Sequence, residues 1–139
     1  MRVHHERLKV STQGKSLHDV TGQIAAVVQR SGVKQGLCNV FIQHTSASLV
    51  IQENADPAVL RDLERWLSDL APERRAWEHD DEGPDDMPAH ARSAITKSSE
   101  SIPVESGALS LGTWQALYVW EHRSHSHRRD LVVTVMGSD

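Results

Sequence analysis

The sequence predicts one α+β domain that spans residues 1–139, with a mainly antiparallel β-sheet or sandwich and two to three helices. Three observations support this fold class. The chain has 139 residues, which is long enough for one domain with a hydrophobic core. Apolar residues alternate along several short segments, as they do in half-buried strands. Hairpin-like pairs of such segments occur together with segments of helical spacing, an order typical of α+β proteins.

The first third of the chain predicts a strand, a helix and a second strand. Residues 2–10 show an imperfect strand pattern. From Asp19 onward apolar residues recur at helical spacing, so Asp19 is expected to cap a helix and Gly32 to follow its end. A strand is predicted over residues 37–44, with His44 at its end.

The hydroxyl-rich stretch Thr45-Ser46-Ala47-Ser48 connects this strand to another, predicted over residues 49–53. If residues 45–48 form a hairpin loop, His44 and Glu53 share one face but lie four residues apart along it, about 13 Å. They are therefore not an acid–base pair within one hairpin. Each is expected to serve a different part of a pocket, or to find partners elsewhere.

The pair Asp56-Pro57 predicts the start of a second helix. Aspartate caps a first turn, and proline is tolerated at the first helical position because its missing amide would be unpaired anyway. Pro72 ends this helix. Its apolar stripe consists of Val59, Leu60, Leu63, Trp66, Leu67 and Leu70.

Residues 78–86 contain six carboxylates and His79. This stretch predicts either a solvated loop or a loop that closes over a site and brings His79 and a carboxylate to it. Asp86 is expected to cap a short helix that ends near Ile95, which places His90 in its first turn. The helix dipole there disfavours the protonated imidazole, so a neutral His90 could accept a proton or bind a metal.

The last third predicts strands over residues 102–104, 109–111, 116–121 and 131–136, the last of which suits the centre of a sheet. The motif Gly112-Thr113-Trp114-Gln115 leads into the third of these strands. Glycine lets the backbone approach a ligand, while Trp114 and Gln115 can stack against one and orient it. A tryptophan that enters a strand is more often a core residue, and both interpretations stay open.

Composition excludes several classes of protein. The formal net charge of −4 argues against nucleic-acid binding through broad phosphate neutralisation. No segment approaches a membrane span or the apolar core of a signal peptide, so we expect no membrane partner and a cytoplasmic location. The single cysteine, Cys38, lies in an apolar strand pattern and is expected to be buried and inert.

The turn over residues 122–129 is rich in histidine and arginine. Three histidines at this spacing could bind a transition metal, although an exposed turn more often binds metal only opportunistically. Arg123, Arg128 and Arg129 form a cationic patch that suits the capture of phosphate or carboxylate. The alternative is that these arginines pair with the acidic loop over residues 78–86.

Four segments together resemble the YjbQ-like family: QHTSASLVIQENADP, EHDDEGPDDMPAH, PVESGALSLGTWQALYVWEHRSH and RRDLVVTVMG. They follow the order and spacing of the family over nearly the whole chain. The family is uncharacterised, and its members are associated with a secondary thiamine-phosphate synthase activity. The resemblance implies an α+β, sandwich-like fold and a homotrimer with pockets near the subunit contacts.

The resemblance also implies a set of polar site residues: His44, Thr45, Ser46, Glu53, Asn54, His79, His90, Thr113, Gln115, Glu121 and Arg123. The residues expected to contact substrate are Thr45, Ser46, Asn54, Thr113, Trp114, Gln115, Glu121 and Arg123. One departure concerns a turn in which many relatives carry His-Gly-Gly after the Glu-His-Arg segment. Residues 124–127 are Ser-His-Ser-His here, which changes the turn in which a phosphate contact would form.

The activity implied by the resemblance joins a pyrimidine methyl diphosphate to a thiazole phosphate and releases diphosphate. His44, His90 and Glu53 would be the catalytic residues. Phosphate would be held by Arg123 with Arg128 or Arg129, and Trp114 or Gln115 would orient the heterocycle. Glu53 and carboxylates of the acidic loop would hold Mg²⁺, a cation that prefers oxygen ligands.

Two alternatives belong to other functional classes. One is a metal-dependent hydrolase of a small phosphate or amide, with His44, His79 and His90 around a transition metal such as Zn²⁺. The other is a non-enzymatic trimer that binds an anionic, phosphorylated metabolite. All three interpretations share a small-molecule partner and need no nucleic acid.

Overall fold

The computed structural model describes residues 1–139, which form eight strands and three helices. In chain order these are β1 (Arg2–Ser11), β2 (Ser16–Asp19), α1 (Thr21–Ser31), β3 (Gln35–Ile42), β4 (Ala47–Glu53), α2 (Pro57–Leu70), α3 (Asp86–Ile95), β5 (Ser99–Glu105), β6 (Ala108–Leu109), β7 (Gln115–Glu121) and β8 (Arg128–Ser138). All strand pairs are antiparallel, which confirms the predicted α+β class.

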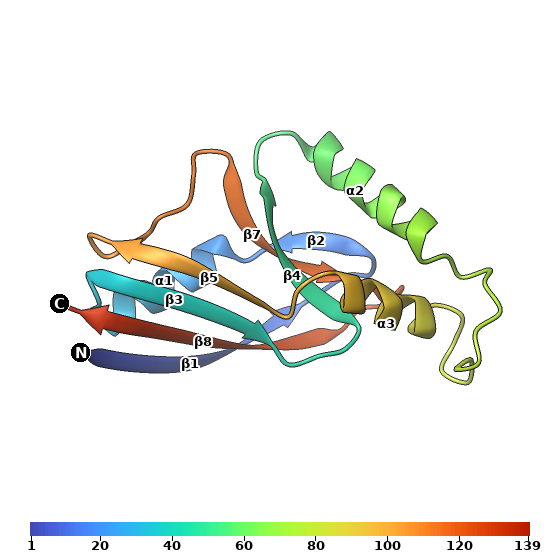
Figure 1. Cartoon of the computed structure of the whole chain (residues 1–139), viewed down its shortest axis with the longest axis horizontal. Helices are drawn as coiled ribbons and strands as arrows, with labels where there is room; N and C mark the ends of the chain where they lie inside the picture. The colour runs from blue at the N-terminus through green and yellow to red at the C-terminus, as the bar shows by residue number, and fades with distance from the viewer.

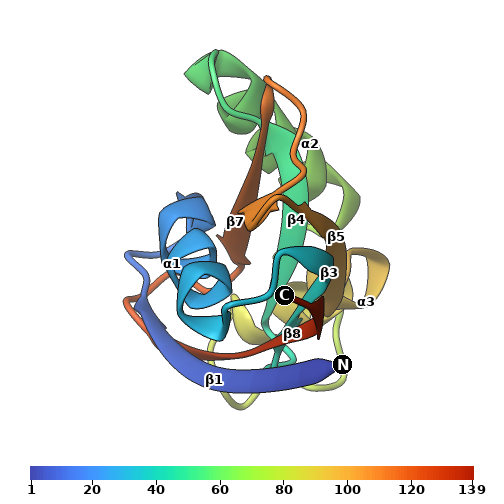
Figure 2. The same cartoon turned by 90° about the vertical axis from the view of Figure 1, so that its left-hand side faces the viewer.

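The strands form two sheets that share one core. A five-stranded sheet has the order β1-β8-β3-β5-β6, and a three-stranded sheet has the order β2-β7-β4. α1 lies in the angle between them, in contact with β1 and β8 of one sheet and β7 of the other (Figure 1, Figure 2). Both chain termini lie at one end of the molecule, and α2 and α3 lie at the other (Figure 1).

Alternation along the strands decides which side chains enter this core. In β5, for example, Ile102 and Val104 are buried while their neighbours Ser101 and Pro103 are exposed. β8 alternates in the same way and lies between β1 and β3, so its predicted central position is confirmed. The buried residues of both sheets and α1 form a single hydrophobic cluster.

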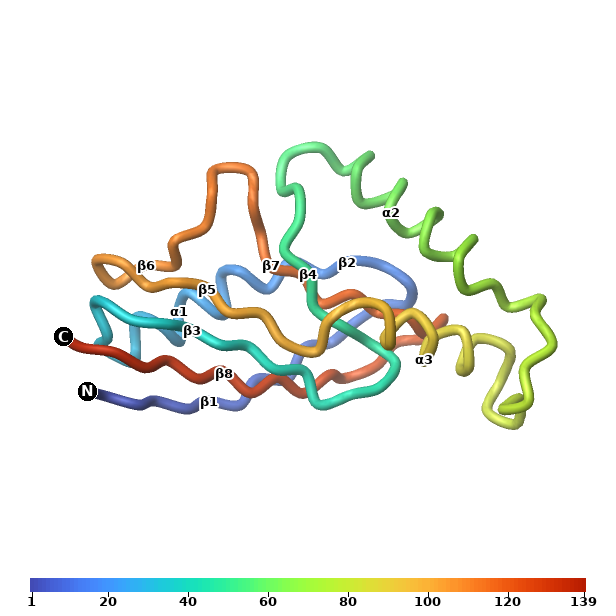
Figure 3. Tube along the Cα trace, viewed as in Figure 1, coloured from blue at the N-terminus to red at the C-terminus, as the bar shows by residue number.

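The chain crosses from one sheet to the other between β3 and β4, which corrects the predicted hairpin (Figure 3). β3 pairs with β5 and β8, whereas β4 pairs with β7. Val40 therefore lies opposite Val133 and Glu100, and not opposite Glu53. The apolar pattern could not reveal this, because a strand buries the same face whichever strand lies beside it.

β2 was not predicted from the sequence. Its four residues, Ser-Leu-His-Asp, contain one apolar side chain and so no alternation. Pairing with β7 holds this segment in the strand conformation instead. The strand predicted over residues 109–111 corresponds to β6. β6 is shorter than predicted, because it consists of Ala108 and Leu109 alone.

Two predicted helix ends are confirmed. The Asp56 side chain accepts a hydrogen bond from the amide of Ala58 at 2.9 Å, and Pro57 is the first residue of α2. Gly32 follows α1 with φ of 74°, a left-handed conformation that favours glycine. Its amide donates to the carbonyl of Gln29 at 3.3 Å and so closes the helix end.

Two other helix starts differ from the prediction. α1 is capped at Val20, although the Asp19 carboxylate still accepts the amide of Thr21 at 2.9 Å. Asp85, and not Asp86, occupies the N-cap position of α3; its side chain makes no capping hydrogen bond, and Asp86 is the first helical residue. Both carboxylates at this helix start bond elsewhere in the fold, as described below.

α2 is amphipathic, but Leu67 is its one buried residue. The Trp66 and Leu70 side chains of the predicted apolar stripe are 57% and 55% exposed. The helix contacts β2 and β4 and otherwise projects from the body of the molecule (Figure 1). A single chain therefore leaves Trp66 and Leu70 of this apolar stripe uncovered, while Val59, Leu60 and Leu63 are half-buried.

Cys38 is buried and forms no disulfide, as predicted. Burial raises the pKa of its thiol to about 11, which keeps the thiol protonated and unreactive. None of the three helices combines the length and apolarity that a membrane crossing requires.

His122 is a fully buried histidine just after β7. Its Nε2 lies 2.8 Å from the Ser48 hydroxyl of β4. Burial, assisted by the charge of Arg92, lowers the pKa of His122 to about 3. The folded protein therefore holds this ring neutral in weakly acidic solution, where an exposed histidine takes up a proton.

This difference predicts acid lability. The pKa in the unfolded chain is about 6.5, so between that value and about 3 the unfolded state binds a proton that the folded state does not. Stability should fall with decreasing pH across this window, by up to about 1.4 kcal/mol per pH unit from this residue. In His122→Gln the slope of the urea midpoint against pH should become shallower. The exposed His125→Gln control should keep the original slope, and an unchanged slope in His122→Gln would exclude His122 as its source.

Candidate functional site

A buried ion pair between Glu121 and Arg129 joins the two sheets. Glu121 ends β7 and Arg129 lies in β8. The Arg129 guanidinium donates from Nε to Oε1 at 2.7 Å and from Nη2 to Oε2, and Glu121 is fully buried. Burial alone would raise the pKa of Glu121, but hydrogen bonds from Arg129 and Thr12 outweigh it and hold the pKa below its usual value.

Arg129 also fixes the hydroxyl-rich stretch. Its Nη2 donates to the Ser46 carbonyl at 3.2 Å and to the Ser46 hydroxyl at 3.1 Å. His44 lies beside it, with Nδ1 at 3.3 Å from Arg129 Nη1 and with Nε2 accepting the amide of Asp130 at 2.8 Å. Burial and the charge of Arg129 lower the pKa of His44. Contacts within the fold thus occupy both ring nitrogens of His44.

His79, Asp86 and His90 bring three potential metal-ligating atoms within 4.8 Å of one another. Asp86 Oδ2 lies 2.8 Å from His79 Nε2 and 3.2 Å from His90 Nε2. His90 is four residues after Asp86, so both side chains lie on one face of α3. We name these three residues the His79–Asp86–His90 cluster.

The fold presets the ring of His90. Its Nδ1 donates a hydrogen bond to the Thr45 carbonyl at 3.0 Å, so the neutral ring presents a lone pair at Nε2, toward Asp86. Histidine ligands of metals commonly make such a second hydrogen bond to a carbonyl. His90 lies in the second turn of α3, one turn after Asp86, so its predicted first-turn position is wrong.

Arg123 fixes the carboxylates at the start of α3. Its Nε donates to Asp85 at 2.9 Å, its Nη1 to Oδ1 of Asp86 at 2.8 Å, and its Nη2 to the Glu82 carbonyl at 3.1 Å. Oδ2 of Asp86 is therefore the oxygen that faces the two histidines. Burial favours the neutral form of Asp85, but Arg123 and the amide of Ser124 outweigh it and hold its pKa at about 2. This confirms the alternative in which Arg123 pairs with the acidic loop.

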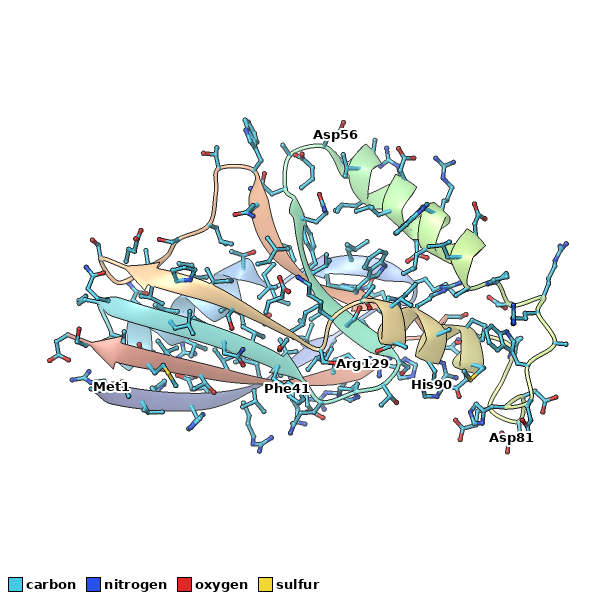
Figure 4. The ribbon with its side chains drawn as sticks, in the orientation of Figure 1. Met1, Phe41, Asp56, Asp81, His90 and Arg129 are labelled. Atoms are coloured by element: carbon cyan, nitrogen blue, oxygen red, sulfur yellow. The ribbon has the colours of Figure 1, made fainter.

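The donor set of the cluster suits a transition metal. Two imidazole nitrogens and one carboxylate oxygen resemble the three-ligand sets of catalytic zinc sites, which leave a position for water or substrate. Mg²⁺ prefers oxygen ligands and is a poorer match. The cluster lies at the end of the molecule that carries α3 and the acidic loop, where His90 and Asp81 are labelled (Figure 4).

Asp86 is a candidate ligand that the sequence did not single out. It is one of the six carboxylates of residues 78–86, one of which was expected to join His79, but Asp86 itself was expected to cap the helix; its spacing of four residues from His90 was the available signal. Conversely, His44 is outside the cluster. The three histidines of the turn over residues 122–129 are outside the cluster too. His122 is buried against Ser48, and His127 Nδ1 donates to the His125 carbonyl at 2.8 Å.

Five predicted site residues lie at the other end of β4 and β7, and the structure does not bring them to the cluster. Glu53 pairs with Gln115 and Ala47 with Glu121, so about six strand residues, roughly 20 Å, separate the two ends. The Glu53 carboxylate accepts the amide of Ala55 at 2.9 Å. Asn54 donates to the Thr113 carbonyl at 3.0 Å, and Trp114 is 65% exposed.

The fold and this geometry define a class: small two-sheet α+β proteins with a histidine–aspartate cluster where a loop meets the start of a helix. The chain belongs to the family described as "UPF0047 protein YjbQ-like", whose model matches residues 6–138. It is 58% identical over 137 residues to UPF0047 protein sll1880 of Synechocystis, covering 98% of this chain and 93% of that protein. It is 38% identical to UPF0047 protein YjbQ of Escherichia coli O157:H7, covering 96% and 98% of the two chains.

Solved structures agree with this assignment. An uncharacterised YjbQ/UPF0047 family protein of Clostridium acetobutylicum superposes with a TM-score of 0.84 at 32% identity, covering 93% of this chain and 99% of that one. A protein of unknown function from Sulfolobus solfataricus superposes with a TM-score of 0.87 and covers 98% and 99%, at 24% identity. The second likeness concerns the fold alone.

The contacts of Arg123 predict that this residue orders the acidic loop. Arg123→Met removes the guanidinium that pairs with the largely buried Asp85 and Asp86 and leaves them only the Ser124 amide and His79, which should cost on the order of 3 kcal/mol. Limited proteolysis should then cleave within residues 78–86 several-fold faster. Arg128→Met, at an exposed position on β8, is the matched control. Equal cleavage rates in both variants would contradict this role of Arg123.

Proposed function

We propose that this chain is a metal-dependent enzyme with hydrolytic chemistry at the His79–Asp86–His90 cluster. The observation that carries the proposal is the convergence of three ligand atoms within 4.8 Å. The hydrogen bonds from Arg123 to Asp86 and from His90 to Thr45 support it, because both orient ligand atoms in advance. A bound divalent ion would supply Lewis-acid polarisation of a substrate oxygen.

The residues around the cluster have separate tasks in this proposal. Asp86 and His90 hold their positions through contacts with Arg123 and the Thr45 carbonyl. The Glu82 carboxylate lies 3.9 Å from His79 Nε2 and is 62% exposed. It is therefore placed to accept a proton and pass it to solvent. His79 comes from the loop, so movement of the loop would open or complete the ligand set.

The surroundings of the cluster favour an amide over a phosphate as the hydrolysed group. A surface cavity of ≈ 670 Å³ beside His79 is lined by Trp77, Met87 and the carboxylates Glu78, Asp80 and Asp81. Carboxylates repel an anionic substrate, and the nearby Arg123 is already paired with Asp85 and Asp86. A neutral or cationic amide fits this cavity better.

This proposal predicts one metal ion per chain. Protein purified without a histidine tag should bind one equivalent of Zn²⁺, and both His90→Gln and Asp86→Asn should weaken binding by at least about 100-fold, because each removes one of three ligands. His125→Gln is the control: it removes one of the nine histidines of the chain at a position outside the cluster, and it should leave the affinity for Zn²⁺ unchanged. Isothermal titration calorimetry with metal analysis measures the effect. Unchanged affinity in His90→Gln places the metal elsewhere.

Secondary thiamine-phosphate synthase activity is the second candidate, and the family resemblance supports it. In this reaction the pyrimidine methyl carbon forms a bond to the thiazole nitrogen, while the bond to diphosphate breaks and diphosphate leaves. The metal would be Mg²⁺ or the ion of the cluster. Arg128 is the exposed arginine of the predicted phosphate patch, whereas Arg123 and Arg129 are paired with carboxylates.

One assay separates the two candidates. The pyrimidine diphosphate is supplied to metal-loaded protein with and without the thiazole phosphate. A synthase releases diphosphate only when both are present, whereas a hydrolase of phosphate esters releases it from the pyrimidine diphosphate alone. The proposed amide hydrolase releases none in either case and instead cleaves members of an amide library, with loss of the rate in His90→Gln. Turnover that survives in His90→Gln contradicts both assignments to this site.

We also propose that the chain forms a homotrimer. If the protein is instead a non-enzymatic binder of anionic metabolites, its ligand would lie near the contacts between subunits. The outer face of the five-stranded sheet supports self-association. Val3, Met136 and Leu37 lie opposite one another across β1, β8 and β3, and their side chains are 38–51% exposed. Sedimentation equilibrium should give three times the mass of 15.5 kDa, and a monomer would exclude the trimer.

A further inference from the structure

A second surface cavity, of ≈ 520 Å³, lies where α2 contacts β2. Its lining residues come from one face of α2, from Pro57 to Arg65, and from β2 with the residue before it. It shares no residue with the cavity beside His79 or with the His79–Asp86–His90 cluster. Its volume falls within the range of small-molecule sites, about 300–1,000 Å³. We name it the β2–α2 cavity.

Part of the wall of this cavity is apolar. Leu17 of β2 and Leu60 of α2 are half-buried, and both line the cavity together with Pro57. Apolar surface that is open to water gains free energy when the apolar part of a ligand covers it. These side chains therefore favour a ligand with a hydrocarbon chain or ring.

Positive charge predominates among the polar lining residues. Lys15, Arg61 and Arg65 are cationic, and Glu64 is the one carboxylate. The Glu64 carboxylate accepts a hydrogen bond from Nε1 of the buried Trp120 at 2.9 Å, so a contact within the fold already engages it. An anionic ligand is thus attracted to the β2–α2 cavity, in contrast to the acidic cavity beside His79.

Arg61 is the cation of this cavity that has no partner in the fold. Lys15 Nζ lies 2.5 Å from the Glu73 carboxylate, and Arg65 Nη2 lies 2.6 Å from the Asp62 carboxylate. Arg61 is exposed and forms neither a hydrogen bond nor an ion pair. Its guanidinium is therefore available to a ligand, and a carboxylate accepts two parallel hydrogen bonds from such a group.

We infer that the β2–α2 cavity binds a small carboxylate with an apolar body, with Arg61 on the carboxylate and with Leu17 and Leu60 against the hydrocarbon. One unpaired guanidinium matches the single charge of a carboxylate. A phosphate monoester carries about 1.5–2 negative charges at neutral pH and would need a further free cation. An uncharged ligand would leave Arg61 without a partner, and a small inorganic anion would leave both leucines uncovered.

Isothermal titration calorimetry of the full chain with octanoate tests this inference. We expect one octanoate per chain, with a Kd on the order of 1 mM or tighter. Octanol has the chain without the charge and acetate has the charge without the chain, so each should bind at least about 10-fold more weakly. Octyl phosphate should bind no more tightly than octanoate. Absence of octanoate binding, equal binding of octanol or acetate, or tighter binding of octyl phosphate overturns the inference.

A matched pair of variants tests the role of Arg61. Arg61→Met removes the guanidinium but keeps an unbranched apolar side chain at an exposed position, and it should weaken octanoate binding by at least about 10-fold. Arg74→Met, at an exposed position outside the cavity, should leave the affinity unchanged. Equal affinities in the two variants overturn the assignment of the carboxylate to Arg61.

Amide NMR spectra locate the bound octanoate. The largest chemical-shift changes should fall within residues 15–17 and 57–65, which contain the lining residues. If they fall instead at Val3, Leu37 and Met136, the ligand binds the outer face of the five-stranded sheet, and the inference is overturned. No metal is added in these measurements, so their outcome is separate from that of the proposed enzyme activity.

Discussion

The buried pair between Glu121 and Arg129 is the interaction on which the candidate site depends. It links the three-stranded sheet to the five-stranded sheet at the point where the chain crosses between them. Thr12, which follows β1, donates to the same carboxylate at 2.6 Å. Removal of one member of such a pair leaves an uncompensated charge in the core, at a cost of about 3–5 kcal/mol. Glu121 and Arg129 are therefore both required for the stability of the fold, because each compensates the buried charge of the other.

The positions of the metal-ligating atoms follow from this pair. The Glu121 carboxylate accepts the amide of Arg123 at 3.0 Å, and the Arg123 guanidinium then holds Asp85 and Asp86 at the start of α3. On the other side, Arg129 holds Ser46, and the preceding carbonyl of Thr45 accepts the hydrogen bond from His90. Two short chains of contacts thus run from the core to the two ligands on α3. His79 alone comes from the loop.

The positions of helices and strands could be predicted from the sequence better than the pairing between strands. Asp56-Pro57 and Gly32 marked helix ends through local chemistry, and local chemistry is visible in sequence. The pairing of β3 with β8, and of β4 with β7, depends on long-range contacts that alternation does not encode. For the same reason His44 was expected at the site, although β8 occupies its ring nitrogens. Asp86 was not distinguished from the other carboxylates of residues 78–86, because an aspartate at a helix start suggests a cap and the residue that orients it, Arg123, lies 37 residues away.

A crystal structure determined at the zinc absorption edge tests most directly whether the His79–Asp86–His90 cluster is a metal centre, as we propose. We expect one anomalous peak per chain, about 2.0–2.2 Å from His79 Nε2, Asp86 Oδ2 and His90 Nε2. Arg123 should still donate to Oδ1 of Asp86, as it does in this structure. A peak at His125 or His127 in the turn over residues 122–129, or none at all, would contradict a metal centre at the cluster.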